Sequence, residues 1–125
     1  MPYRAKSLTR SRSVAFTRQS GRCFYCGCEM WLCNSQDFCA RYTLTPVQAK
    51  RFQCTGEHLL AKQDGGGIGR DNIVAACAFC NRTRHKRKKP LKPDAYGAYV
   101  RKQLARRSWH LPWVFEKGLV APVAR

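Results

Sequence analysis

Hydrophobic residues in this chain occur in short runs that glycine, proline and polar residues interrupt. Residues 54–61 and 72–76 predict two strands, because each is a brief, largely apolar segment bounded by turn-forming residues. The segment between them, 64–70, predicts a loop, since it has four glycines in five positions. Residues 79–88 predict a helix that Pro90 stops. The middle of the chain is therefore expected to run strand, loop, strand, helix.

Two further helices are expected outside this segment. Thr45 suits an N-cap and Pro46 the first turn of a helix that continues to Phe52. Residues 93–107 predict another helix, because apolar residues recur on one face at helical spacing. These residues are Tyr96, Tyr99, Val100 and Leu104, and a proline-containing tail with Trp109, Trp113 and Phe115 follows them. We expect the tyrosines and tryptophans of this region to belong to the core.

The N-terminus carries several basic residues and no acidic one. Residues 14–19 predict a short helix that Gly21 ends, and the stretch before it predicts a flexible arm. The chain is interpreted as a basic arm at 1–20, a core at 21–90, and a C-terminal helix with an aromatic tail at 91–125 that packs on the core. The expected fold class is α+β.

The charge of the chain narrows the choice of partner. Its 125 residues include 24 Lys and Arg against 7 Asp and Glu, a formal net charge of +17. This excess predicts a polyanionic partner, with nucleic acid first and an anionic membrane second. No apolar run approaches the roughly 18–20 residues that span a bilayer, so no membrane partner is expected. The N-terminus lacks the apolar stretch of a secretory signal, which favours a cytoplasmic location over a transit peptide. The oligomeric state stays open.

The eight cysteines predict thiols or metal ligands, because disulfides are rare in a reducing cytoplasm. Two Cys-x-x-Cys pairs, Cys23/Cys26 and Cys77/Cys80, together supply the four thiolates of a tetrahedral zinc site. No coordination position stays open, so this zinc is expected to be structural. A disulfide framework, a redox pair, and Cys28 as a substitute ligand are the competing interpretations. Cys33, Cys39 and Cys54 have no assigned role.

Several residues between and beside these pairs carry groups used in phosphodiester hydrolysis. His58 can act as the general base, because the pKa of an imidazole lies near neutral pH. Glu57 and Asn81 offer the oxygen ligands that Mg²⁺ or Mn²⁺ prefers, and such a cation stabilises charge on the phosphate. His85 lies four residues after Asn81 on the same helical face, which makes it a candidate third ligand. An imidazole ligand would favour softer ions such as Mn²⁺, Ni²⁺ or Zn²⁺.

Glu57 and His58 are adjacent, and this constrains how they can cooperate. Neighbouring residues of a straight strand point to opposite faces, so the two side chains cannot serve one centre from such a strand. We therefore expect them at a frayed strand end or in a loop, where the directions of the side chains are less restricted.

This combination resembles the HNH endonuclease family, also called ββα-metal or His-Me finger nucleases. The resemblance rests on Glu57-His58, on the later Asn72 and Asn81, and on the two cysteine pairs, and it covers about residues 21–90. It implies a small ββα-metal core stapled by a four-cysteine zinc site, with flanking helices, that hydrolyses DNA with one divalent cation. It also implies that Asn72 orients the His58 imidazole. Asn81 is a departure, because histidine is the other common residue there, and weaker metal binding is implied.

A basic run follows these residues and is expected to contact phosphates. Its members are Arg82, Arg84, Lys86, Arg87, Lys88 and Lys89. DNA is favoured over RNA as the partner, but an RNA-cleaving enzyme stays open because the chemistry does not require a deoxyribose. Two further interpretations are a non-catalytic, zinc-stabilised module that binds nucleic acid, and a disulfide-stapled cationic protein.

Overall fold

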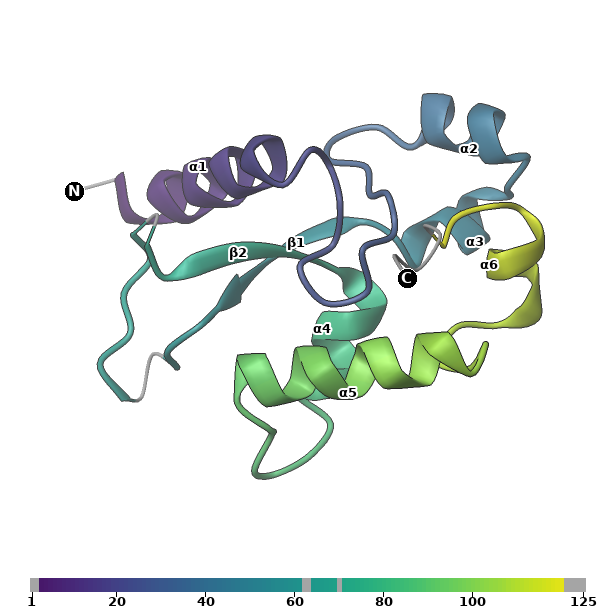
Figure 1. Cartoon of the computed structure of the whole chain (residues 1–125). Helices are drawn as coiled ribbons and strands as arrows, with labels where there is room; N and C mark the ends of the chain where they lie inside the picture. The colour runs from purple at the N-terminus through teal and green to yellow at the C-terminus, as the bar shows by residue number, and fades with distance from the viewer. Residues whose placement is uncertain (1–2, 62–63, 70, 121–125) are drawn as a thin grey trace.

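An antiparallel pair of strands forms the centre of the fold (Figure 1). β1 (Cys54–His58) and β2 (Ile73–Cys77) are paired along all 5 residues of each strand. α4 (Ala78–Arg84) follows β2 without a break. The middle of the chain thus runs strand, loop, strand, helix, as the hydrophobic pattern predicted.

The other helices surround this unit, and the fold is α+β as expected. They are α1 (Tyr3–Arg18), α2 (Gln36–Tyr42), α3 (Pro46–Lys50), α5 (Pro93–Ala105) and α6 (Pro112–Glu116). The computed structural model describes residues 3–61, 64–69 and 71–120. Residues 1–2 of the predicted arm, 121–125 of the predicted tail and Arg70 of the predicted loop lie outside the described residues.

The N-terminal segment is a helix, and the prediction of a flexible arm before residue 14 was wrong. α1 extends over 16 residues and packs against both strands. Ala15 is buried in this contact, and the Ser11 hydroxyl donates to the Ile68 carbonyl at 2.7 Å. α1 has few apolar residues, so its sequence pattern is weak. Its stability comes from packing on the sheet, as for most short helices in proteins.

The two faces of β1 carry different side chains, because alternate residues of a strand point to opposite sides. Gly56 faces α1, since a Cβ atom at this position would lie 3.5 Å from Leu8. Thr55 faces α4, and its hydroxyl accepts a hydrogen bond from the Asn81 amide at 3.0 Å. Figure 1 shows the same layers, with α1 on one side of the sheet and α4 and α5 on the other. This alternation assigns each functional side chain of β1 to one of the two helices.

The sequence located the starts of two helices correctly but misplaced the end of a third. α3 and α5 begin at Pro46 and Pro93, as predicted. α4 ends at Arg84, before the predicted end at residue 88. The Arg84 Nε atom donates to the Leu91 carbonyl at 3.0 Å, a bond that draws the following chain back beside the helix.

The N-terminus of α3 offers a direct test of a local sequence signal. The Gln48 N–H donates to Thr45 Oγ1 at 3.1 Å, and the Thr45 N–H donates to Gln48 Oε1 at 2.9 Å, which completes a capping box. Thr45→Ala is expected to lower the free energy of unfolding by about 1 kcal/mol, measured by urea denaturation. Thr17→Ala, at an exposed position inside α1, is the control and should raise it by only a few tenths of a kcal/mol, because alanine is the better helix former. Equal effects of the two substitutions would contradict the role of the cap.

The hydrophobic core joins the cysteine-containing turn, the sheet and the C-terminal helices. Its largest fully buried side chains include Tyr25, Phe52, Ile73, Val100, Val114 and Leu119. Tyr96 is buried and Trp109 and Trp113 pack against the core, as predicted, whereas Tyr99 is 41% exposed, contrary to the prediction. Among the described residues, none of the helices has the length and apolar character needed to cross a membrane.

Candidate metal centres

Four cysteines from two distant parts of the sequence lie together: Cys23, Cys26, Cys77 and Cys80. Their sulfur atoms all lie within 4.8 Å of one another, and all four residues are buried. The sulfurs of Cys26 and Cys77 are 3.9 Å apart. Two sulfurs bound tetrahedrally to one zinc ion, at about 2.3 Å each, lie about 3.8 Å apart. The predicted cysteines therefore form a cluster that could bind zinc.

Local backbone geometry presents each pair. In the first turn, the Gly27 N–H donates to the Cys23 carbonyl at 3.0 Å. Gly27 has a φ of 74°, a left-handed conformation that glycine adopts without a steric penalty. The second pair spans the junction of β2 and α4, where Cys77 is the N-cap and its sulfur accepts a hydrogen bond from the Cys80 N–H. A strand–helix junction and a tight turn thus supply two sulfurs each.

The surroundings of the cluster favour negatively charged sulfur. Cys23 Sγ accepts hydrogen bonds from the N–H groups of Tyr25 at 3.4 Å and Cys77 at 3.3 Å, and the Trp109 indole donates to Cys80 Sγ at 3.3 Å. Burial nevertheless raises the pKa of both Cys77 and Cys80, because it disfavours the charged thiolate. The neighbouring Cys23 sulfur raises both pKa values further, because adjacent thiolates repel one another. A divalent cation fits this donor set, since it balances the charge that the buried sulfurs cannot carry alone.

A second group, Cys26, Cys28 and His110, adjoins the cluster. The Arg51 Nε–H donates to His110 Nδ1 at 3.0 Å, so this nitrogen carries the lone pair and Nε2 carries the proton. Burial and the Arg51 charge lower the pKa of His110 to about 3, so the ring is neutral near pH 7. A protonated Nε2 cannot coordinate a metal ion, so His110 is not arranged as a ligand here.

All eight cysteines lie among the described residues and all are free, so the disulfide interpretation has no support. Cys28 is fully buried beside the cluster, and Cys33 is exposed. Cys54 is buried on β1, and burial raises its pKa to about 12. Cys54 therefore behaves as a core thiol.

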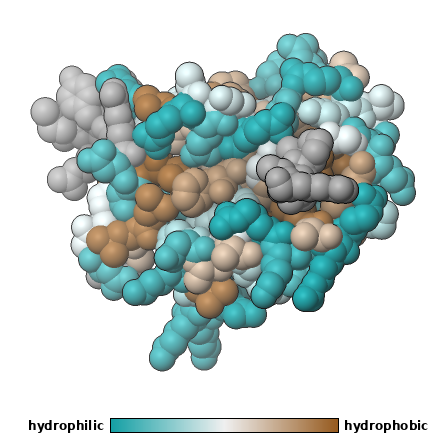
Figure 2. Space-filling view, viewed as in Figure 1, coloured by the Kyte–Doolittle hydropathy of each residue, from teal (hydrophilic) through white to brown (hydrophobic). Residues whose placement is uncertain are grey.

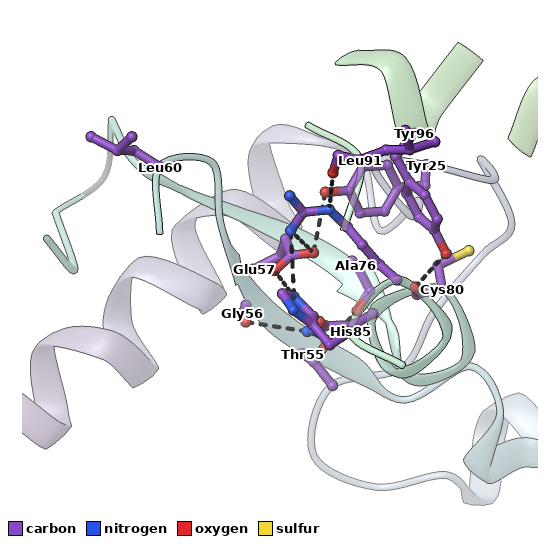
Figure 3. A network of polar contacts seen from close by, with 12 residues as sticks. Tyr25, Thr55, Gly56, Glu57, Leu60, Ala76, Cys80, His85, Leu91 and Tyr96 are labelled. Atoms are coloured by element: carbon purple, nitrogen blue, oxygen red, sulfur yellow. Dashed lines mark hydrogen bonds and ion pairs between the residues drawn. The ribbon is translucent and has the colours of Figure 1, made fainter. Parts of the chain in front are cut away.

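Glu57 is the centre of a buried polar network on the α4 side of the sheet (Figure 3). Glu57 Oε2 accepts hydrogen bonds from the Tyr25 hydroxyl and from the Arg84 guanidinium, both at 3.2 Å. Glu57 Oε1 lies 2.9 Å from His85 Nε2. Glu57 is 3% exposed and Arg84 8%, so water screens this ion pair little. Burial and the Glu57 charge raise the pKa of Tyr25, which keeps its hydroxyl protonated as a donor.

Asn81 and His85 extend this network from the end of α4. The Asn81 amide donates to Thr55 Oγ1 at 3.0 Å and to the Gly56 carbonyl at 3.4 Å. His85 is the C-cap of α4 and is half exposed, whereas Glu57 is buried. The structure therefore brings three of the predicted site residues to one face of the sheet, with His85 at the solvent edge.

His58 is not brought together with these residues. It is the last residue of β1 and is paired regularly with β2, as is Glu57, so the expected frayed end or loop was wrong. By alternation its side chain shares the face of Gly56, toward α1. His58 Nε2 is buried and has no hydrogen-bond partner among the described residues.

The Asn72 side chain holds the loop that follows His58. Its Oδ1 accepts from the Leu60 N–H at 2.7 Å, and its Nδ2 donates to the carbonyls of Leu60 at 2.9 Å and Gly67 at 2.8 Å. Gly66 approaches this loop so closely that a Cβ atom would lie 1.8 Å from the Leu60 oxygen. These bonds go to the backbone and not to the His58 imidazole that the resemblance implied, so Asn72 orders the loop in this structure.

Most of the predicted phosphate-contact residues are exposed, but Arg84 is not. Arg82, Lys86, Arg87, Lys88 and Lys89 are exposed. Figure 2 shows hydrophilic side chains projecting at the foot of the molecule, where the segment between α4 and α5 lies in Figure 1. Arg84 turns inward to Glu57, so its prediction as a phosphate contact does not hold.

Two tyrosines that organise the site were not among the predicted site residues. Tyr25 lies between two of the clustered cysteines and reaches Glu57. The Tyr96 ring packs edge-on against Tyr25 at 4.8 Å, and its hydroxyl donates to the Cys80 carbonyl at 2.8 Å. An aromatic residue inside a Cys-x-x-Cys turn was the available signal, but its contact with Glu57 depends on the tertiary fold.

Comparisons with protein-family models, curated proteins and solved structures found no match to this chain.

Proposed function

We propose that this chain is a metal-dependent endonuclease that hydrolyses phosphodiester bonds in DNA, with a structural zinc ion in the four-cysteine cluster. Glu57, Asn81 and His85 would hold one divalent cation, Mg²⁺ or Mn²⁺, between β1 and α4. When bound, this cation supplies stabilisation of the charge that develops at the phosphate. The net charge of +17 supports nucleic acid as the substrate.

The meeting of a carboxylate from β1 and an imidazole from the end of α4 carries this proposal. Glu57 Oε1 and His85 Nε2 are 2.9 Å apart. Two adjacent ligands at about 2.1 Å from one cation, at right angles to each other, lie about 3 Å apart. The spacing of Glu57 and His85 therefore suits a shared cation. Asn81 lies one helical turn before His85, and its amide nitrogen bonds to the same strand.

The donors around Glu57 leave one of its oxygens for this purpose. Tyr25 and Arg84 both bond to Oε2 of the buried carboxylate. Oε1 points toward His85, which is half exposed. The protein thus holds the carboxylate through one oxygen and directs the other to the edge of the site.

Water activation is the one catalytic role whose candidate residue does not lie beside these metal ligands. The family resemblance assigns it to His58, which lies at the end of β1 on the α1 face. For His58 to activate the water, the phosphate must lie at the end of β1, within reach of both faces of the strand. The effect of His58→Ala on cleavage therefore tests the assignment of the base separately from the assignment of the ligands.

One observation favours a second candidate function, a zinc-stabilised module that binds nucleic acid without cutting it. The Glu57 charge is already balanced by Arg84 in a buried ion pair at 3.2 Å. A structural role for Glu57 would need no cation and no chemistry. An RNA-cleaving enzyme is distinguished from both by the substrate that is cut.

Glu57→Gln is expected to lower metal-dependent cleavage of a supercoiled plasmid by about 100-fold or more, because it removes a charged metal ligand. His58→Ala is expected to lower it by about 10²–10⁴-fold if His58 is the general base. Cleavage is measured with Mg²⁺ or Mn²⁺, and with both omitted. Mn²⁺ binding to each variant, followed by its electron paramagnetic resonance signal, provides a readout independent of activity.

Glu116→Gln is the matched control, since Glu116 is an exposed acid on α6. It should leave both cleavage and Mn²⁺ binding unchanged. Tight binding of plasmid without cleavage in either metal would contradict the DNase proposal and support the binding module. Cleavage of RNA alone under the same conditions would identify the substrate as RNA.

A further inference from the structure

A groove of about 350 Å³ lies between α3 and α6, away from the Glu57 network. The residues that line it include Val47, Lys50, Arg51, Arg82, Leu111 and Trp113. Figure 1 shows the two helices at the same end of the molecule, at the far end of the sheet from the loop that joins the strands. The groove is therefore a surface feature that the proposed metal site does not account for.

Part of the groove lining is exposed apolar surface. Val47 is 77% exposed and Leu111 is 51% exposed, the two largest values among the exposed large hydrophobic residues. Trp113 is half-buried beside them, and the Phe52 ring packs edge-on against its indole at 6.2 Å. A rigid aromatic side chain between exposed aliphatic ones is a surface on which a planar apolar group can stack.

Cationic side chains line the groove beside these apolar residues. Lys50 and Arg82 are exposed at the groove. The Arg51 guanidinium is held 3.6 Å above the Phe79 ring and bonds to His110, so it contributes a fixed positive charge. Among the described residues, no acidic one lines the groove. An occupant that complements this groove has a flat apolar part and negative charge beside it.

We propose that this groove binds an unpaired nucleobase of single-stranded nucleic acid, with Lys50 and Arg82 on the neighbouring phosphates. Arg82 directly follows Asn81, so a strand bound here continues toward the proposed metal site. A duplex does not complement the groove, because its base faces are stacked on one another and only the base edges are accessible in its grooves. The inference rests on the nucleic-acid partner of the proposed function, but not on cleavage.

Val47→Glu tests the inference with little risk to folding. Val47 is exposed in the first turn of α3, where a carboxylate interacts favourably with the helix dipole. The substitution removes the apolar contact and places a negative charge beside the phosphates. The expected loss of affinity for a labelled oligothymidylate is about 5-fold or more, the lower end of the range for losing one base–aromatic stacking contact. Fluorescence anisotropy without added Mg²⁺ or Mn²⁺ measures binding with no cleavage.

Two further variants separate the charge from the apolar surface. Thr17→Glu adds the same charge at an exposed position of α1, on the other side of the sheet from α4, and should weaken binding less than Val47→Glu does. Val47→Ser removes the apolar surface without adding charge and should weaken oligothymidylate binding but not duplex binding. Equal effects of Val47→Glu and Thr17→Glu would overturn the inference, as would an equal effect of Val47→Ser on a duplex of the same length. Selective weakening of oligothymidylate binding by a protein that cuts no plasmid would support the groove and contradict the nuclease proposal.

Discussion

Cys77→Ser is expected to abolish the zinc binding proposed for the four-cysteine cluster and to unfold the chain. Structural zinc contributes about 10–16 kcal/mol to the folding of zinc-finger peptides at pH 7, as much as the whole stability of about 5–15 kcal/mol of a typical domain. In this chain the cluster joins the N-terminal turn to the junction of β2 and α4. Serine cannot supply the thiolate, so both the site and this link are lost. The zinc content per chain and the far-ultraviolet circular dichroism of the purified variant measure the two effects.

Cys33→Ser is the matched control, because Cys33 is exposed and lies outside the cluster. It should retain one zinc ion per chain and the melting temperature of the parent protein. Removal of zinc from the parent protein by a chelator should reproduce the loss of structure seen with Cys77→Ser. A Cys77→Ser protein that keeps both zinc and the parent melting temperature would contradict the four-cysteine site.

Arg84→Met is expected to lower the free energy of unfolding by about 3–5 kcal/mol, the usual range when one member of a buried ion pair is removed. The substitution removes the guanidinium partner of the Glu57 carboxylate, which is 3% exposed in the parent protein, and leaves Tyr25 as its buried donor. It also removes the bond from Arg84 to the Leu91 carbonyl. Urea denaturation at saturating zinc measures the change, so that loss of the metal does not contribute.

The double variant Glu57→Gln with Arg84→Met distinguishes an unpaired charge from lost packing. It should recover much of the stability, because neither charge is then left without its partner. Arg87→Met replaces an exposed arginine of the same basic run and should change the stability by less than about 0.5 kcal/mol. If Arg84→Met costs no more than Arg87→Met, the buried pair does not stabilise the fold.

Local signals in the sequence identified several elements of the fold correctly. The order β1, β2, α4 followed from short apolar runs and a glycine-rich loop, and the start of α3 followed from Thr45 and Pro46. α1 was largely missed, because its few apolar residues are meaningful only against the sheet that they cover. The end of α4 was misplaced, since the hydrogen bond from Arg84 to Leu91 is invisible in the local pattern.

The candidate site was also predicted only in part. The grouping of Glu57, Asn81 and His85 was predicted because i and i+4 residues share a helical face and the helix follows the sheet directly. The orientation of His58 was not, because it depends on whether the strand remains regular to its last residue. The roles of Glu57, His58, Asn81 and His85 in catalysis stay predictions.

The sequence by itself determined the cysteine spacing, the positive charge and the order of the central elements, because each is a property of neighbouring residues or of composition. Only the tertiary structure decided that Arg84 is a buried partner of Glu57 instead of a phosphate contact, and that Tyr25 connects the cysteine turn to Glu57. It also decided that His58 faces α1, away from Glu57. These outcomes depend on which faces of distant elements pack together. Two basic residues of one run can therefore differ completely in exposure when only one of them lies over a buried carboxylate.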